Sequence, residues 1–209
     1  MFELREAVLP ISDEVRAELQ RQWTQIASPG TWLDGAQRVA VASEARAARA
    51  RTEAGTGLPD TVVEAAHSVA AAAPDVSAAW VDDLEERGLA VEAYVEIVGV
   101  VGRLAAIDAC VRGLGGTVEP LPDPGPGAPS RRRNHAAQWH GAFVPTEGGT
   151  RAPLMLTAVP EEAQAQMVLH GALYLTEEEM TDLERSDALH RPQMEFVASR
   201  VSWLNDCPY

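Results

Sequence analysis

The scarcest groups in this chain that could do chemistry are its thiols. The 209 residues contain two cysteines, Cys110 and Cys207. Two cysteines cannot make a disulfide framework, and Cys110 falls in the most apolar stretch of the chain, which predicts a buried helix. A core cysteine behaves as a small hydrophobic residue. Any nucleophilic or redox chemistry of a thiol must therefore rest on Cys207.

Carboxylates and histidines supply weaker candidates. Glu92 and Glu96 are one helical turn apart, and a carboxylate pair in a pocket could transfer protons. A charged stripe on a partly exposed helix explains the same spacing. His135 and His140 have a spacing compatible with zinc, but no further ligand lies at a matching interval, so we expect no metal site. His170 lies beside apolar residues on a predicted helix and is expected to be a core or boundary histidine.

Composition and charge exclude several classes of function. The chain is 46% hydrophobic and 23% charged, values that are usual for a globular protein. Its formal net charge of -14 repels nucleic-acid phosphates and anionic lipids, so we expect neither as a partner. Four charged residues interrupt the apolar stretch 95–114, which argues against a membrane span. No secretory signal opens the chain, and we expect a cytoplasmic protein.

The elements that must position these groups are predicted to be helices. Behind a Ser12 cap, the apolar residues of the first helix recur at steps of three and four. Further helices are expected at about residues 35–51, 61–73, 76–87 and 92–114. None of the first 115 residues shows the alternating pattern of a half-buried strand. The expected fold class is all-α, with residues 1–115 as one helical domain.

Residues 116–152 interrupt the helical pattern. Their central sequence, PLPDPGPGAPSRRR, is rich in proline and glycine and too poor in apolar residues to pack by itself. This composition predicts a linker, and residues 131–133, the one cluster of arginines, are expected to be a solvated part of it.

Helical patterning returns in residues 153–209. Thr176 and Glu179 form a capping box ahead of a short helix, and Pro192 opens the last helix. One face of this last helix is apolar, while Glu195 points elsewhere. That apolar face consists of Met194, Val197, Val201 and Leu204. Cys207 follows at the C-terminal end of the helix.

The last helix repeats part of the second one. Residues 37–43 (QRVAVAS) and 193–199 (QMEFVAS) share four residues of seven, 156 positions apart, although such a match arises easily in a chain rich in alanine and valine. In this alignment Cys207 corresponds to Arg51, and Glu195 corresponds to Val39. The first copy thus has neither group and continues for 63 residues beyond Arg51, whereas the second ends two residues after Cys207. We infer one complete repeat and the beginning of a second.

The sequence of residues 191–209, RPQMEFVASRVSWLNDCPY, resembles the signature of the alkylhydroperoxidase AhpD-like and carboxymuconolactone decarboxylase-like family. In that family a glutamate precedes a Cys-x-x-Cys pair by twelve residues, which is the separation of Glu195 and Cys207. Residues 30–40 (GTWLDGAQRVA) and 93–99 (AYVEIVG) resemble the N-terminal half of tandem-repeat members. The resemblance implies an AhpD-like helical bundle.

The resemblance also implies an antioxidant, thiol-dependent peroxidase of the alkyl hydroperoxide reductase type. In the family one cysteine attacks the peroxide, the other resolves the product as a disulfide, and a glutamate and a downstream histidine relay the proton. No metal or organic cofactor takes part. Carried over, Cys207 is the thiol and Glu195 the proton relay, with a peroxide substrate and a thiol reductant as partners.

In this chain, the position of the family's second cysteine would come directly after Tyr209. We therefore expect weak or absent turnover, also because the carbonyl groups at a helix C-terminus disfavour a thiolate. Such an ending fits a cysteine codon changed to a stop, a selenocysteine codon read as a stop, or a chain cut at this point.

Two other functions stay open. The first is a non-catalytic helical protein that forms homo-oligomers. The second is a lactone decarboxylase-like enzyme, because that branch works without the cysteine pair. Activity that survives Cys207→Ala would favour the decarboxylase, whereas stable oligomers without turnover would favour the scaffold.

Overall fold

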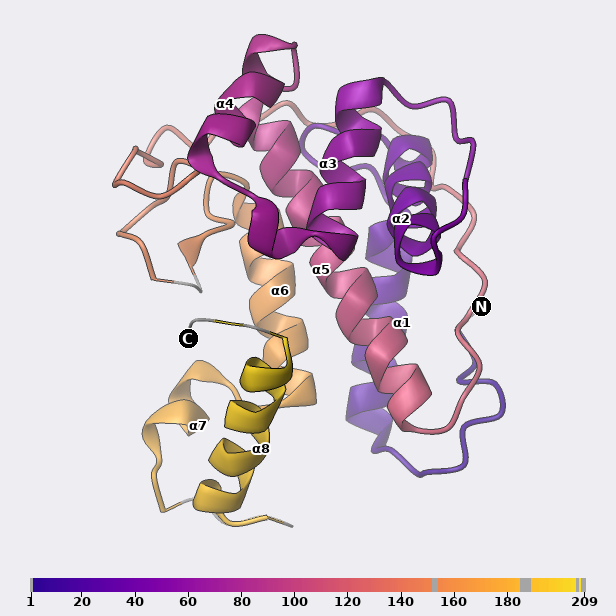
Figure 1. The fold of residues 1–209 in the computed structure, drawn as a ribbon. Helices are drawn as coiled ribbons and strands as arrows, with labels where there is room; N and C mark the ends of the chain where they lie inside the picture. The colour runs from indigo at the N-terminus through magenta and orange to yellow at the C-terminus, as the bar shows by residue number, and fades with distance from the viewer. Residues whose placement is uncertain (1, 152–153, 185–188, 206, 208–209) are drawn as a thin grey trace. The chain divides into compact units, whose positions relative to one another are not determined.

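A computed structural model of the chain describes residues 2–151, 154–184, 189–205 and 207. The described residues form helices joined by turns and irregular segments and include no strand, so the predicted all-α fold class is confirmed (Figure 1). Gln138 and Thr146 make an isolated antiparallel bridge. The helices are α1 (Asp13–Ile26), α2 (Gly35–Ala50), α3 (Asp60–Ala71), the 3-10 turn η1 (Ala73–Asp75), α4 (Ala78–Glu86), α5 (Val91–Gly113), α6 (Pro160–Leu173), α7 (Glu177–Thr181) and α8 (Arg191–Leu204).

The chain divides into two compact units, Met1–Leu169 and His170–Tyr209. The first contains α1 to α5, the irregular segment after α5 and most of α6. The second contains the end of α6 together with α7 and α8. This division differs from the boundaries expected at residues 115 and 152, because residues 116–152 and the start of α6 belong to the same unit as the first five helices.

Helix α5 is the centre of the first unit. It contacts α1, α2 and α3, and in Figure 1 it runs diagonally through that unit. Ile97, Val100, Leu104 and Ile107 are completely buried. A helix that is apolar around its whole circumference is buried on all sides, which explains why residues 95–114 form the most apolar stretch. Within the described residues, no helix has the length and apolar character to cross a membrane.

Local sequence determines several helix ends. The Ser12 hydroxyl accepts a hydrogen bond from the backbone of Val15 at 3.2 Å, as predicted for the cap of α1. Thr176 and Glu179 form the predicted capping box of α7. Both the Ser12 cap and the capping box bind N–H groups that the start of a helix leaves without partners, so these short polar patterns are reliable start signals.

The segment after α5 is irregular, as its composition predicts, but it is fixed to the helices of the first unit. The backbone N–H of Gly125 donates to the carbonyl of Ala27 at 2.8 Å, and that of Ser130 donates to the carbonyl of Gly30 at 3.0 Å. Glu119 in this segment is 1% exposed. The segment has no core of its own and packs against the helices of the first unit instead.

Candidate functional site

Helix α8 carries Glu195 and is followed by Cys207, the two residues that the sequence predicts to be catalytic. It begins at Arg191 with Pro192 in its first turn. Proline suits this position because an N–H in the first turn has no partner within the helix. The side chain of Gln193 accepts a hydrogen bond from the backbone of His190 at 2.9 Å. Within the segment of family-like sequence, residues 191–204 therefore form a helix, as expected.

Glu195 is held by two neighbours on the surface of the second unit. Its Oε1 accepts hydrogen bonds from Arg191 Nε at 2.6 Å and from the Tyr174 hydroxyl at 3.2 Å. Burial raises the pKa of Tyr174, and the Glu195 carboxylate raises it further, against the opposing effect of Arg191. Tyr174 therefore stays a neutral phenol that donates its proton to Glu195.

The two cysteines have different surroundings. Cys207 is exposed and lies beyond Asn205, the C-cap of α8, and its backbone N–H donates to the carbonyl of Ser202 at 2.9 Å. Cys110 lies in α5 and is half-buried, and burial raises the pKa of its thiol. Cys207 is therefore the more accessible of the two thiols.

No contact between Glu195 and Cys207 occurs in the described part of the chain. The nine helical steps from Glu195 to Leu204 alone span about 14 Å along α8. An apolar groove of about 480 Å³ in the second unit is lined by residues that contact Glu195 and Cys207. Tyr174, which contacts Glu195, and Ser202, which binds the backbone of Cys207, both line it. The lining residues are His170, Tyr174, Leu189, Met194, Val197, Ala198, Val201 and Ser202.

His170 gives this groove an imidazole ring. Its Nδ1 lies 2.9 Å from the carbonyl of Leu175, and a carbonyl only accepts, so Nδ1 donates this hydrogen bond. Its ring meets Tyr174 edge-on at 5.6 Å between centroids. The expectation of a boundary histidine is confirmed, since His170 is half-buried, but sequence reasoning missed its place in the groove. The four-residue spacing of His170 and Tyr174 was the available signal.

A buried cluster of charges lies in the first unit, where α2, α5 and α6 meet. Arg38 Nη1 donates to Glu96 Oε1 at 2.5 Å and to Glu162 Oε1 at 2.8 Å. Arg103 Nη2 donates to the other oxygen of Glu162 at 2.5 Å. The side chains of these four residues are at most 3% exposed. The cluster therefore joins α2, α5 and α6 through buried ion pairs.

The pKa values of the two carboxylates in this cluster are shifted in opposite directions. Burial raises the pKa of Glu96, and the Arg38 guanidinium and the backbone N–H of Trp32 offset only part of this increase. Burial also acts to raise the pKa of Glu162, but Arg103 and Arg38 together outweigh it and the pKa is lowered. Glu162 is thus the carboxylate that the two guanidinium groups hold as an anion.

The side chains of Glu92 and Glu96 have different surroundings. Glu96 is buried in the charge cluster, so the expectation of a charged stripe on a partly exposed helix is wrong for this residue. Glu92 pairs with Arg133 at 3.4 Å. The signal that sequence reasoning overlooked was Glu96 followed seven residues later by Arg103, on one face of an otherwise apolar helix.

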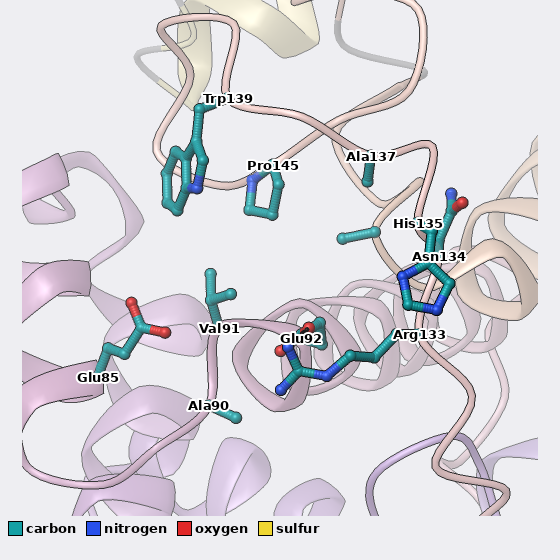
Figure 2. Close-up of a pocket in the computed structure, with 11 residues that line it drawn as sticks. Glu85, Ala90, Val91, Glu92, Arg133, Asn134, His135, Ala137, Trp139 and Pro145 are labelled. Carbon is teal, nitrogen blue, oxygen red and sulfur yellow. Dashed lines mark ion pairs between the residues drawn. The ribbon is translucent and has the colours of Figure 1, made fainter.

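A polar pocket of about 370 Å³ lies at the start of α5 in the first unit (Figure 2). Glu85 of α4 and Trp139 lie at one end of it, and Arg133 and His135 lie at the other, with Val91 between them. Within the described ranges, no group of three His, Cys, Asp or Glu side chains is placed to hold an ion.

No protein-family model matches the chain. Neither a curated protein nor a solved structure matches it.

Proposed function

We propose that this chain is a thiol-dependent peroxide reductase of low turnover, with Cys207 as the peroxidatic thiol and Glu195 as the proton relay. The observation that carries the proposal is the arrangement around α8. An exposed thiol follows the helix, a carboxylate lies twelve residues before it, and one apolar groove reaches the neighbours of both. The AhpD-like spacing of the two residues supports the same function.

The chemistry that this arrangement allows is a two-electron reduction. The Cys207 thiolate attacks the terminal oxygen of a hydroperoxide ROOH, the O–O bond breaks, and the sulfur becomes a sulfenic acid while an alkoxide leaves. The proton that the Cys207 thiol lost passes through solvent and Glu195 to the alkoxide, which gives ROH, and the Tyr174 hydroxyl holds the Glu195 carboxylate by a hydrogen bond. An external thiol then displaces water from the sulfenic acid, and a second one restores Cys207 and leaves as a disulfide.

Low turnover is part of the proposal. Cys207 follows the C-terminal end of α8, which presents carbonyl oxygens in place of N–H donors to an attacking sulfur. Each cycle also needs a thiol from outside. A cytoplasmic location would keep that thiol and Cys207 reduced.

The test is to trap the sulfenic acid. The full chain would be treated with cumene hydroperoxide and dimedone, and adducts at both cysteines would be followed by mass spectrometry. We expect the adduct at Cys207 and little at Cys110, no adduct in Cys207→Ser, and a rate in Glu195→Gln lower by about tenfold or more. Glu178→Gln, at an exposed position of the same unit, should leave the rate unchanged.

Equal oxidation of both cysteines would refute the assignment of Cys207. A Glu195→Gln rate equal to that of the Glu178→Gln control would refute the proton relay.

A second candidate function is self-association without catalysis, and the exposure of large apolar side chains on α8 favours it. Phe196 is 76% exposed and Trp203 is 69% exposed. Contiguous exposed apolar surface commonly marks an interaction site. A second copy of the chain would cover it, which is the homo-oligomer expected from the sequence. Analytical ultracentrifugation of the wild type and of Phe196→Ser tests this function: a monomer at all concentrations would exclude it.

A further inference from the structure

We propose that the pocket at the start of α5 (Figure 2) binds a small zwitterion, a molecule with a cationic amine at one end and a carboxylate at the other. The pocket lies wholly in the first unit and shares no residue with the groove beside α8. The inference is therefore independent of the proposed peroxidase chemistry.

One end of the pocket suits a cation. Glu85 projects from α4, and within the described structure its carboxylate makes no ion pair or side-chain hydrogen bond. The indole of Trp139 lies at the same end and is 56% exposed. A free carboxylate beside an aromatic ring is the combination that attracts an ammonium group, through charge and through the face of the ring.

The other end suits a carboxylate. Arg133 makes one ion pair, with Glu92 at 3.4 Å, and its guanidinium also lies over the Trp32 ring, 5.4 Å from the ring centroid. A guanidinium has five N–H donors in a planar fork, so one such pair leaves donors for a second carboxylate. His135 adds a ring nitrogen at this end.

The space between the two ends suits a short chain. Ala90, Val91 and Ala158 line it, and small apolar side chains of this kind accommodate methylene groups. A volume of about 370 Å³ is near the lower end for small-molecule sites. A simple anion would face Glu85 and Glu92, and a simple cation would face Arg133. A zwitterion satisfies both ends at once.

The experiment is a titration of the full chain, labelled with ¹⁵N at its tryptophan indoles, with β-alanine, 4-aminobutyrate and 6-aminohexanoate. Butyrate and butylammonium serve as single-charge probes, and the loss of one indole signal in Trp139→Leu assigns Trp139. We expect one of the amino acids to shift the Trp139 signal with a Kd of about 1 mM at low salt. High salt should weaken the binding because the charges are partly exposed.

Variants test the two ends separately. Glu85→Gln and Arg133→Gln should each weaken binding by about threefold to tenfold. The matched control is Glu86→Gln, which removes the same charge from the neighbouring position of α4 outside the pocket. Phe143→Leu controls for Trp139→Leu in the same loop.

Three results would overturn the proposal. The first is that no amino acid shifts the Trp139 signal at 50-fold the expected Kd. The second is that butyrate or butylammonium binds as tightly as the amino acids. The third is that Glu85→Gln or Arg133→Gln binds as the Glu86→Gln control does.

Discussion

Arg38 Nη1 donates to Glu162 Oε1 at 2.8 Å, so a guanidinium of α2 holds a carboxylate that lies 124 residues further along the chain. Arg103 of α5 binds the second oxygen of the same carboxylate. Three helices of the first unit therefore meet at one buried anion. This contact fixes the start of α6 on the helices that precede the proline-rich segment.

Removal of the Glu162 charge should destabilise the first unit strongly. Glu162→Gln leaves two buried guanidinium groups short of a counter-charge, and we expect the free energy of unfolding to fall by about 3–5 kcal/mol. Urea denaturation followed by circular dichroism measures this change. Glu161→Gln is the control, because the side chain of Glu161 is 41% exposed and pairs with Arg132, and it should cost no more than about 1 kcal/mol. Equal effects would contradict the role of the cluster.

The contribution of Glu162 should depend on pH in a defined direction. Its pKa is lowered on folding, so its carboxylate stabilises the folded state fully above the ordinary value of 4.5 and loses that effect as pH falls through the lower, folded value. The difference in unfolding free energy between wild type and Glu162→Gln should therefore be constant from pH 6 to 7 and shrink below pH 4.5. A difference that grew on acidification would have the wrong sign.

Two glycines should respond oppositely to alanine. A Cβ on Gly30 would collide with the Glu96 carboxylate and the Arg38 guanidinium, whereas a Cβ on Gly113 would meet nothing within 4 Å. We expect Gly30→Ala to lower the free energy of unfolding by about 1–3 kcal/mol. Gly113→Ala, at the last position of α5, should raise it by up to about 1 kcal/mol. Thermal unfolding of both variants under one set of conditions distinguishes these outcomes.

Glu119 should hold the N-terminal segment in place. Its Oε1 accepts hydrogen bonds from the backbone N–H groups of Glu3 at 3.0 Å and Arg5 at 3.2 Å. Glu119→Ala leaves these groups unsatisfied, at a cost of about 1–3 kcal/mol, and amide hydrogen exchange at residues 3 and 5 should accelerate. Glu53→Ala, at an exposed position, is the control. Unchanged exchange in Glu119→Ala would show that other contacts hold the segment.

The two thiols should react with Ellman's reagent at different rates. Cys207 is exposed, whereas Cys110 is half-buried with a raised pKa, so we expect Cys207 to react about tenfold faster or more. Stopped-flow absorbance of Cys110→Ser and Cys207→Ser measures each thiol alone. Similar rates in the two variants would mean that α5 opens readily to solvent.

Helix positions were largely predictable because they depend on neighbours in the chain. The expected fifth helix, at about residues 92–114, is α5 at Val91–Gly113, and the Ser12 cap and the box of Thr176 and Glu179 form as predicted. Caps and apolar spacing act over three or four residues, a range that the sequence displays directly. The placement of Glu195 and Cys207 on and after one helix is local in the same way.

The partners of these residues were less predictable. Tyr174 contacts Glu195 from a position 21 residues earlier. The groove of the second unit combines residues of α8 with His170, Tyr174 and Leu189, which precede that helix. Glu96 was expected to be partly exposed, and it is buried because Arg38 and Glu162 arrive from distant helices to neutralise it. The contact between Tyr174 and Glu195 has no spacing signal in the sequence. For Glu96 the sequence shows the interval to Arg103 but not the partners from distant helices.

By itself, then, the sequence determined the all-α class, most helix bounds and caps, the irregular character of residues 116–152, and the twelve-residue interval between one carboxylate and one thiol. Tertiary structure alone decided that the irregular segment lies against the helices, that four charges are buried together, and that Glu85 and Arg133 lie at opposite ends of one pocket. The physical reason is the distance along the chain over which each interaction acts. Backbone hydrogen bonding and apolar periodicity act between near neighbours in the chain, whereas the burial of a charge depends on which distant segments come to surround it.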